Sequence, residues 1–204
     1  LGDVYKRQVL EPSFLYGGYP CKDLRHKFLM AQGSNAEYLT KDVLPKGFAM
    51  IDLPGHFLDM VGFRTPDDVV YLADCLSSRE TLDKYQIGFI YDVGAYIKTL
   101  EMVKTLKAKI FIPAHAAAAE DISELAQYNI DKVYEIGEKI IELCKEPLSF
   151  EVILQKLFTE YGLEMNFEQY VLVGSTVRSY LSWLKDTGKL NTEFVHNMLL
   201  WQQV

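Results

Sequence analysis

Residues 48–56 read FAMIDLPGH, a short apolar segment that ends in a proline, a glycine and a histidine. The apolar part has the length and composition of a buried strand. Pro54 and Gly55 are strong turn residues, so the strand should stop at Leu53. His56 is therefore expected just beyond the end of a strand.

Two later segments end in a similar way. Residues 69–73 are β-branched and apolar and predict a strand that ends at Asp74. Residues 109–112 predict another strand, and His115 follows it after a proline. Side chains at strand ends lie at the loop edge of a sheet, where functional sites are usually built.

His56, Asp74 and His115 are spaced by 18 and 41 residues. Imidazole nitrogen and carboxylate oxygen are the ligands expected for Zn²⁺ in a hydrolytic site. Each of the three taken alone has an ordinary alternative role, as a turn residue or a strand-ending cap. Their common position after strands makes a metal site the preferred hypothesis.

The order Pro-Gly-His, strand-final Asp and Pro-x-His resembles the C-terminal half of the metallo-β-lactamase superfamily over residues 48–115. The resemblance implies an αββα sandwich that binds one or two metal ions, here zinc, and hydrolyses a small-molecule substrate. It implies that His56 binds the first metal and His115 the second. It also implies that Asp74 bridges both and orients the attacking hydroxide, which makes it the catalytic residue.

The sequence departs from the family pattern at several positions. Residues 57–59, Phe-Leu-Asp, replace the usual small and polar residues, and Ala73 and Ala116 stand where glycines are common. The family also has a His-x-His-x-Asp-His motif in its N-terminal half. The chain has four histidines and no two of them are two residues apart, so this motif is absent: His26, His56, His115 and His196.

Residues 1–8 resemble a translated sequencing-library adapter rather than a protein segment. We interpret them as an assembly scar, with the native sequence cut just upstream of Val9. This interpretation predicts that the missing motif lies upstream of Val9 in the gene. The chain would then be a fragment that is inactive alone.

Helical and strand periods alternate through the middle of the chain. An apolar stripe follows Asp92 at helical spacing, and residues 122–144 predict a long amphipathic helix. Residues 9–47 carry many turn signals and predict mainly loop with short strands. The expected fold is α/β, a partial αββα sandwich over residues 9–146.

Residues 147–204 form a second predicted domain with a winged-helix-like pattern. Ser149 should cap a helix that Gly162 closes, a short helix is expected over residues 166–173, and Ser175 should cap a third helix. A β-hairpin is expected around His196 and Asn197. Four basic and six acidic residues leave this region at net charge −2, which disfavours nucleic acid as a partner.

The whole chain has 204 residues and a net charge of −7. No apolar run approaches the roughly 20 residues of a membrane-spanning helix, so no membrane partner is expected. Three widely separated cysteines fit reduced thiols in the cytoplasm. We expect the C-terminal region to pack against the rest of the chain or to form a homodimer.

Four further residues have two readings each. Asp59 and Asp92 could orient metal ligands, or could serve as a turn residue and a helix cap. Tyr85 could line a substrate pocket or fill the core. Cys75 could bind zinc, but neighbouring strand residues point to opposite faces, so the core is its expected place.

Two functions remain open from the sequence. The first is a metal-dependent hydrolase, with one or two zinc ions and an unknown substrate. The second is a non-catalytic winged-helix interaction protein whose N-terminal layer performs no chemistry.

Overall fold

The computed structural model describes residues 11–25 and 39–204. The scar assigned to residues 1–8, and His26, lie outside the described residues. The helices and strands, including two 3₁₀ helices, follow in chain order: α1 Glu11–Tyr16, η2 Lys22–Leu24, η3 Lys41–Val43, β1 Ala49–Asp52, β2 Val61–Arg64, β3 Val69–Ser77, α2 Arg79–Tyr85, α3 Val93–Thr105, β4 Ile110–His115, α4 Ser123–Leu143, β5 Leu148–Ser149, α5 Phe150–Glu160, α6 Phe167–Asp186, β6 Leu190–Val195 and β7 Met198–Gln203.

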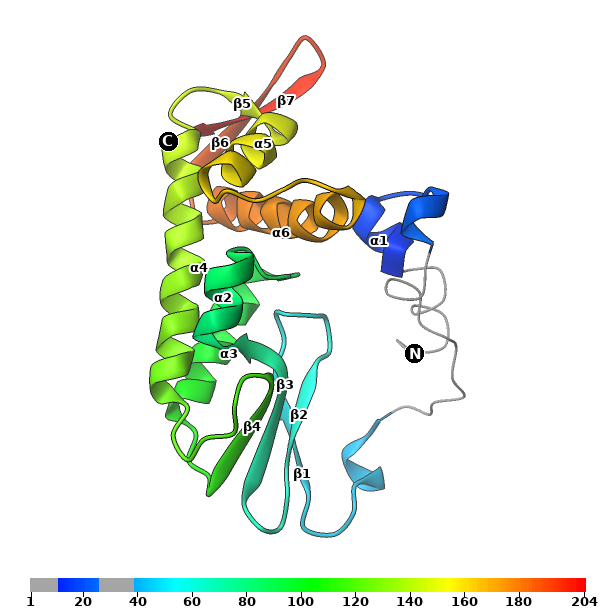
Figure 1. Ribbon diagram of the computed structural model, residues 1–204, viewed down its shortest axis with the longest axis vertical. Coiled ribbons are helices and arrows are strands. Elements are labelled where there is room, and N and C mark those ends of the chain that lie inside the picture. The colour runs from blue at the N-terminus through cyan, green and yellow to red at the C-terminus, as the bar shows by residue number, and fades with distance from the viewer. Residues whose placement is uncertain (1–10, 26–38) are drawn as a thin grey trace.

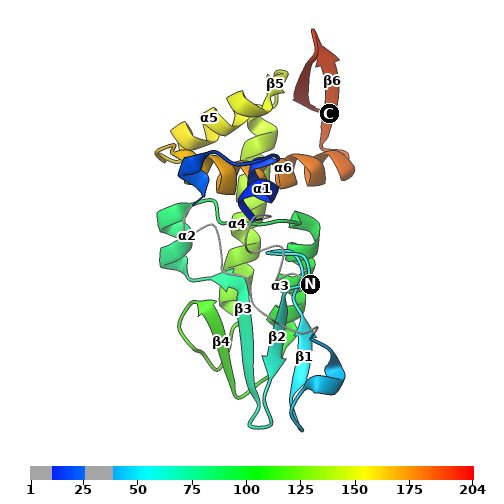
Figure 2. The same ribbon diagram turned by 90° about the vertical axis from the view of Figure 1, so that its right-hand side faces the viewer.

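The larger sheet has four strands in the order β1-β2-β3-β4. β1 and β2 pair antiparallel, as do β2 and β3, whereas β3 and β4 pair parallel. Helices α3 and α4 lie against one face of this sheet (Figures 1 and 2). The α/β architecture expected from the sequence is therefore present.

The sheet face toward the helices is built from alternating apolar residues. Val70 and Leu72 of β3 and Phe111 of β4 are buried, and their chain neighbours point to the other face. The buried residues of α3 and α4 pack on them in one hydrophobic cluster, which also includes residues of α5 and α6. The four-stranded sheet thus packs against the helices through one continuous hydrophobic core.

A second, three-stranded sheet forms near the C-terminus, with the order β5-β7-β6. Its hairpin turns at His196 and Asn197, which adopt φ values of 50° and 65°. Two consecutive left-handed residues are what a two-residue hairpin loop requires. The predicted hairpin is confirmed, while the division of the chain at residue 147 stays a prediction.

The helix predicted to start at Ser175 and the short helix before it are one element. Helix α6 runs unbroken through Ser175, with Asn166 as its cap. Thr176 and Ser179 are accommodated inside the helix because their hydroxyls bond to carbonyls four residues earlier. The same two hydroxyls bond to the backbone of residues 88–91, so tertiary contacts hold the helix through this polar segment.

The N-terminal expectation was also incorrect. Residues 11–16 form helix α1, and the described parts of residues 9–47 contain no strand.

Helix α2 was not predicted from the sequence. Ser78 caps this helix by accepting a hydrogen bond from the Thr81 amide. None of the helices in the described ranges combines the length and the hydropathy needed to cross a bilayer.

Candidate functional site

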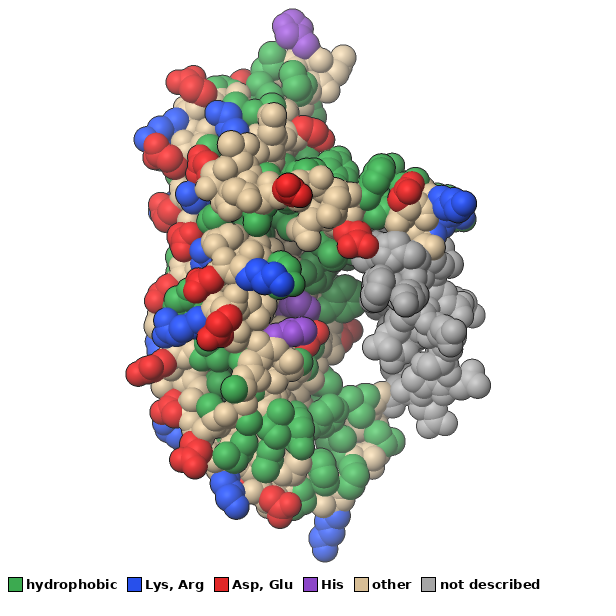
Figure 3. Space-filling view, viewed as in Figure 1, with side chains coloured by type: hydrophobic (Ala, Val, Ile, Leu, Met, Phe, Trp, Pro, Cys, Tyr) green, Lys and Arg blue, Asp and Glu red, His purple; other side chains and the backbone are tan. Residues whose placement is uncertain are grey.

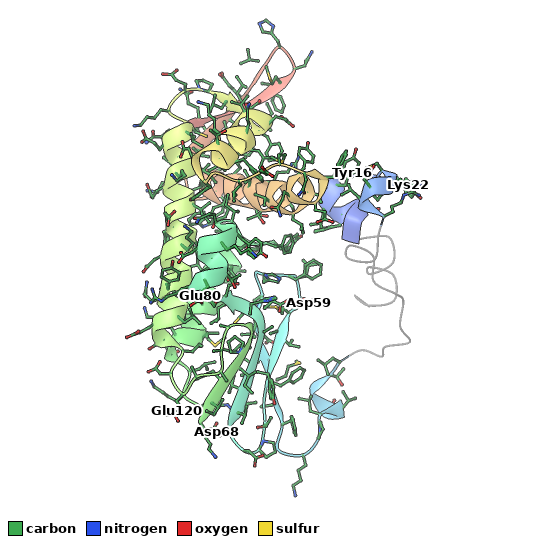
Figure 4. The ribbon with its side chains drawn as sticks, viewed as in Figure 1. Tyr16, Lys22, Asp59, Asp68, Glu80 and Glu120 are labelled. Carbon is green, nitrogen blue, oxygen red and sulfur yellow. The ribbon has the colours of Figure 1, made fainter. Side chains whose placement is uncertain are left out.

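The strand directions bring the three predicted ligands to one edge of the sheet. Because β1 and β3 are both antiparallel to β2, they run in the same direction, and β4 runs parallel to β3. The C-terminal ends of these three strands therefore share an edge. Figure 4 shows Asp59 at this edge, and Asp68 and Glu120 at the opposite one.

His56 is held by a turn that packs directly on helix α3. Gly55 has a φ of 120°, and a Cβ atom there would lie 2.3 Å from both the backbone nitrogen and the Cα of Tyr96. Its carbonyl accepts hydrogen bonds from the amides of Tyr91 and Asp92 at 3.0 and 2.9 Å. The glycine thus lets the loop approach the helix closely, and this contact places His56.

Asp74 does not end its strand, contrary to the prediction from the sequence. Strand β3 continues to Ser77, and its register with β4 shifts on both sides of Ala73. Ala73 adopts a left-handed φ of 47°. This irregularity changes which face of the sheet the following side chains point to. Cys75 therefore points into the core, and Asp74 lies half-buried at the sheet edge.

The two imidazoles approach different oxygens of the Asp74 carboxylate. The Nε2 atom of His56 lies 3.8 Å from Oδ2, and the Nε2 atom of His115 lies 3.4 Å from Oδ1. His56 is 23% exposed, Asp74 43% and His115 55%. Figure 3 shows two histidine side chains together on this face, so the cluster opens to solvent.

The surroundings keep His56 in its neutral form. Burial lowers its pKa below the usual value, against the opposing effect of the Asp74 carboxylate. The nearby His115 lowers the pKa further, and a hydrogen bond to the Phe89 backbone raises it. Neutral imidazole is the form that binds metal ions, and a hydrogen bond to the ring fixes its orientation.

The donor set fits part of a metal site. A carboxylate flanked by one imidazole on each oxygen has the donor types that zinc prefers. Within residues 11–25 and 39–204, however, no group of three or more His, Cys, Asp or Glu side chains is arranged to hold one metal ion. Each imidazole faces its own carboxylate oxygen, which fits two adjacent and incomplete positions better than one complete position.

A cavity of about 60 Å³ opens beside this cluster, with His56 and Asp74 in its wall. The opposite wall is formed by α4 and α6, including Asn129, Lys132 and Tyr180. The site edge of the sheet is therefore continuous with a recess toward the helical layer.

The other predicted site residues lie around the cluster. Asp59 is exposed on the β1–β2 loop, and Asp92 caps α3 by accepting a hydrogen bond from the Ala95 amide at 2.9 Å. Tyr85 is exposed at the end of α2, beneath the Lys84 ammonium group, and is not among the described residues that line the cavity. Cys75 is fully buried, which confirms the expected core position.

Sequence reasoning missed the aromatic residues beside His56. The His56 ring meets Phe89 edge-on, at 5.4 Å between ring centroids. The ring centroid of Phe57 lies 6.1 Å from that of Tyr91 and 6.3 Å from that of Phe14, a residue of α1. The unusual Phe57 thus belongs to an apolar wall next to the site, and no local pattern could reveal a contact between residues 14 and 57.

We expect Ala73→Gly to raise the free energy of unfolding by about 0.5–1 kcal/mol. Glycine removes the cost of a left-handed alanine, and its greater freedom in the unfolded chain offsets only part of that gain. Urea denaturation measures the change. The control is Ala114→Gly in β4, where the φ is not left-handed and glycine should lower stability. Equal losses in both variants would contradict the strain at Ala73.

We expect one of the three thiols to react in the native protein. Cys75 and Cys144 are fully buried, and burial raises the pKa of these thiols to about 12 and about 11. Cys21 is partly exposed. A thiol-disulfide reagent should therefore modify about one thiol per chain without denaturant and all three thiols with denaturant. Rapid reaction at Cys75 without denaturant would show that the core beneath the site opens readily.

Comparison with known proteins addresses the fold. No protein-family model and no curated protein matches the sequence. Among solved structures, the chain is similar to a metallo-β-lactamase family protein from Thermus thermophilus, with a TM-score of 0.67 and 13% identity over 94% of this chain and 62% of that one. It is also similar to a β-lactamase domain protein from Burkholderia ambifaria, with a TM-score of 0.62 and 14% identity over 86% of this chain and 55% of that one.

The chain spans less than two thirds of either neighbour. At 13–14% identity the likeness concerns the fold, and it extends over 94% and 86% of this chain. The Thermus thermophilus neighbour carries the name of the family that residues 48–115 resemble. The chain therefore has the metallo-β-lactamase fold.

Proposed function

We propose that this chain supplies one part of a dinuclear, zinc-dependent hydrolase site. The observation that supports the proposal best is the Asp74 carboxylate with one imidazole at each oxygen, 3.8 and 3.4 Å away. A carboxylate in this position can bind two metal ions at once. His56 would hold the first ion and His115 the second.

Zinc, when bound, would lower the pKa of a bound water toward 7 and act as a Lewis acid toward a carbonyl or phosphoryl group. The chain's own residues position this chemistry. The Phe89 backbone orients the His56 ring, and burial keeps that ring neutral. Asp74, placed at the edge by the irregular strand, would orient the nucleophile, and the aromatic wall would exclude water from one side.

The substrate is a small molecule of a class that the fold leaves open; thioesters, lactones and phosphodiesters all contain a centre that such a site attacks. The cytoplasm is the proposed location, based on three cysteines with no disulfide among the described residues. We assign the region from residue 147 a winged-helix-like packing or dimerisation role, because its net charge disfavours nucleic acid.

Zinc titration of the 204-residue chain tests this proposal. The described residues offer two ligands to each metal position, whereas catalytic zinc sites normally have three protein ligands and a water. We expect weak zinc binding by calorimetry and no zinc-dependent turnover of thioester, lactone or phosphodiester substrates. His56→Ala and His115→Ala should each weaken the binding further, by about tenfold or more.

His196→Ala is the matched control, since His196 lies in the turn between β6 and β7, far from the ends of β1, β3 and β4 (Figure 1). It should leave zinc binding unchanged. Equal zinc affinity in the parent, His56→Ala and His115→Ala chains would refute the ligand assignment. Tight stoichiometric zinc with turnover would show that the ligand set is larger than the three residues named.

A non-catalytic interaction protein is the second candidate. It is favoured by the lack of a single three-ligand metal position among the described residues and by the contacts of α5 and α6 with each other and with the hairpin. Zinc affinity of the His56 and His115 variants distinguishes the two candidate functions. Only the hydrolase site predicts a zinc affinity that depends on His56 and His115.

A further inference from the structure

The loop that joins α2 to α3 lies between helix α6 and the turn that carries His56 (Figure 1). On the side of the turn, the Tyr91 amide donates hydrogen bonds to the carbonyls of Gly55 and His56, at 3.0 and 3.3 Å. Phe89 forms a hydrogen bond to the His56 ring through its backbone, and its own ring lies 5.4 Å from that ring between centroids. Residues 89–91 therefore contact both the backbone and the imidazole of His56.

Two hydroxyl groups of α6 hold the other side of this loop. The Thr176 hydroxyl accepts a hydrogen bond from the Ile90 amide at 3.0 Å and donates to the Gly88 carbonyl at 3.3 Å. The Ser179 hydroxyl donates to the Tyr91 carbonyl at 2.7 Å. The loop is thus bonded on one side to the turn and on the other side to α6.

The loop depends on Thr176 because it has few other hydrogen bonds. Among the described residues, no backbone–backbone hydrogen bond holds residues 88–90. Thr176 is fully buried and Ile90 is 6% exposed, so solvent does not reach the bond between them. A buried amide that loses its acceptor is costly, and the loop would have to move to give it another partner.

The same hydroxyls also lie near carbonyls of their own helix. Thr176 is 3.3 Å from the carbonyl four residues earlier in α6, and Ser179 is 3.2 Å from the corresponding one. Bonds of this kind slightly destabilise a helix and often bend it. The helix therefore gains little from the two hydroxyls, whereas the loop gains its attachment.

We propose that Thr176 and Ser179 are positioning residues for His56. They fix the loop of residues 88–91, and this loop fixes the orientation of the imidazole toward Asp74. The C-terminal region, which the sequence assigns to a separate winged-helix-like domain, thereby contributes to the framework of the site. The inference rests on the proposed function for the role of His56 as a metal ligand, but the positioning itself requires no metal.

NMR of the full chain without metal tests the positioning directly. Long-range proton–nitrogen spectra report the tautomer and the hydrogen bonding of each imidazole, and the spectrum of His56→Ala identifies the His56 signals. Thr176→Val keeps the shape of the side chain and removes the hydroxyl, so it should shift the His56 ring nitrogens and leave those of His196 unchanged. Thr176→Ser keeps the hydroxyl and should restore the parent signals.

Ser182→Ala is the matched control, since the Ser182 hydroxyl bonds to the Arg178 carbonyl inside α6. It should leave the His56 signals unchanged. A purely structural role predicts that Thr176→Val lowers the thermal midpoint while the His56 signals stay as in the parent, and this result would overturn the proposal. Ser179→Ala removes a half-buried hydroxyl and replaces Thr176→Val in this test if that variant does not fold.

Zinc titration separates this inference from the proposed function. If zinc binds as proposed, Thr176→Val should weaken the binding by up to about tenfold, because groups that orient a ligand contribute to metal affinity. Zinc affinity that does not depend on His56, with His56 signals that shift in Thr176→Val, would refute the zinc site alone. Zinc affinity that depends on His56, with His56 signals unchanged in Thr176→Val, would refute the positioning alone.

Discussion

Gly55→Ala is expected to destabilise the protein by about 3 kcal/mol or more. The φ of 120° at this position is closed to an alanine, and the added Cβ would meet the Tyr96 backbone at 2.3 Å. Backbone atoms of a packed helix cannot rotate away as a flexible side chain can. For a chain of this size the thermal midpoint should fall by roughly 6–12 °C, measured by circular dichroism.

The variant should also disturb the site. The loop would have to move away from α3, and the hydrogen bonds from Tyr91 and Asp92 to the Gly55 carbonyl would lengthen. His56 would move with it, so zinc affinity should fall as in His56→Ala. Gly88→Ala is the control, since a Cβ there meets no atom within 4 Å. A Gly55→Ala chain as stable as the Gly88→Ala chain would contradict the close approach of the loop to the helix.

The second large effect concerns the sheet face opposite the helices. Met50, Phe63, Tyr71 and Ile112 are paired in register across the four strands, so they form one apolar row. Tyr71 is 45% exposed. Figure 3 shows hydrophobic side chains gathered over the strands of this sheet. An exposed apolar patch of this kind favours association, so we expect concentration-dependent self-association in analytical ultracentrifugation.

Phe63→Glu combined with Tyr71→Lys should weaken the association by at least about tenfold, because buried aromatic residues often contribute more than 1–2 kcal/mol to an interface. The two residues are directly opposite, so the new charges attract each other and the sheet is preserved. Tyr134→Lys, at a tyrosine of 46% exposure on α4, controls for charge alone. Association that persists in the double variant but is lost in Tyr134→Lys would place the interface on the helical side.

Local sequence patterns were sufficient for most of the elements. Apolar runs closed by turn residues predicted β1 and the C-terminal hairpin, and the 3.6-residue period predicted α3 and α4. The strand predicted over residues 109–112 is present as β4, but it continues through Pro113 to His115. These features succeed because they depend on neighbours within a few residues. The three candidate ligands were also visible in this way, since each lies at or near the end of a recognisable strand.

Tertiary packing decided what local patterns could not. Helix α6 continues through Ser175 because the hydroxyls of Thr176 and Ser179 bond to the loop of residues 88–91, far away in the sequence. The strand irregularity at Ala73 depends on pairing with β4, and it alone determines that Asp74 faces the site while Cys75 is buried.

The sequence by itself determined which donor groups exist and that each lies at or near the end of an apolar strand. Only the tertiary structure decided that they meet. Convergence of His56, Asp74 and His115 depends on the order and direction of three strands, and the cavity beside them depends on Tyr180 from a helix about 100 residues after Asp74. Such contacts carry no local sequence signal, because they are selected by the packing of whole elements against one another rather than by the preferences of neighbouring residues.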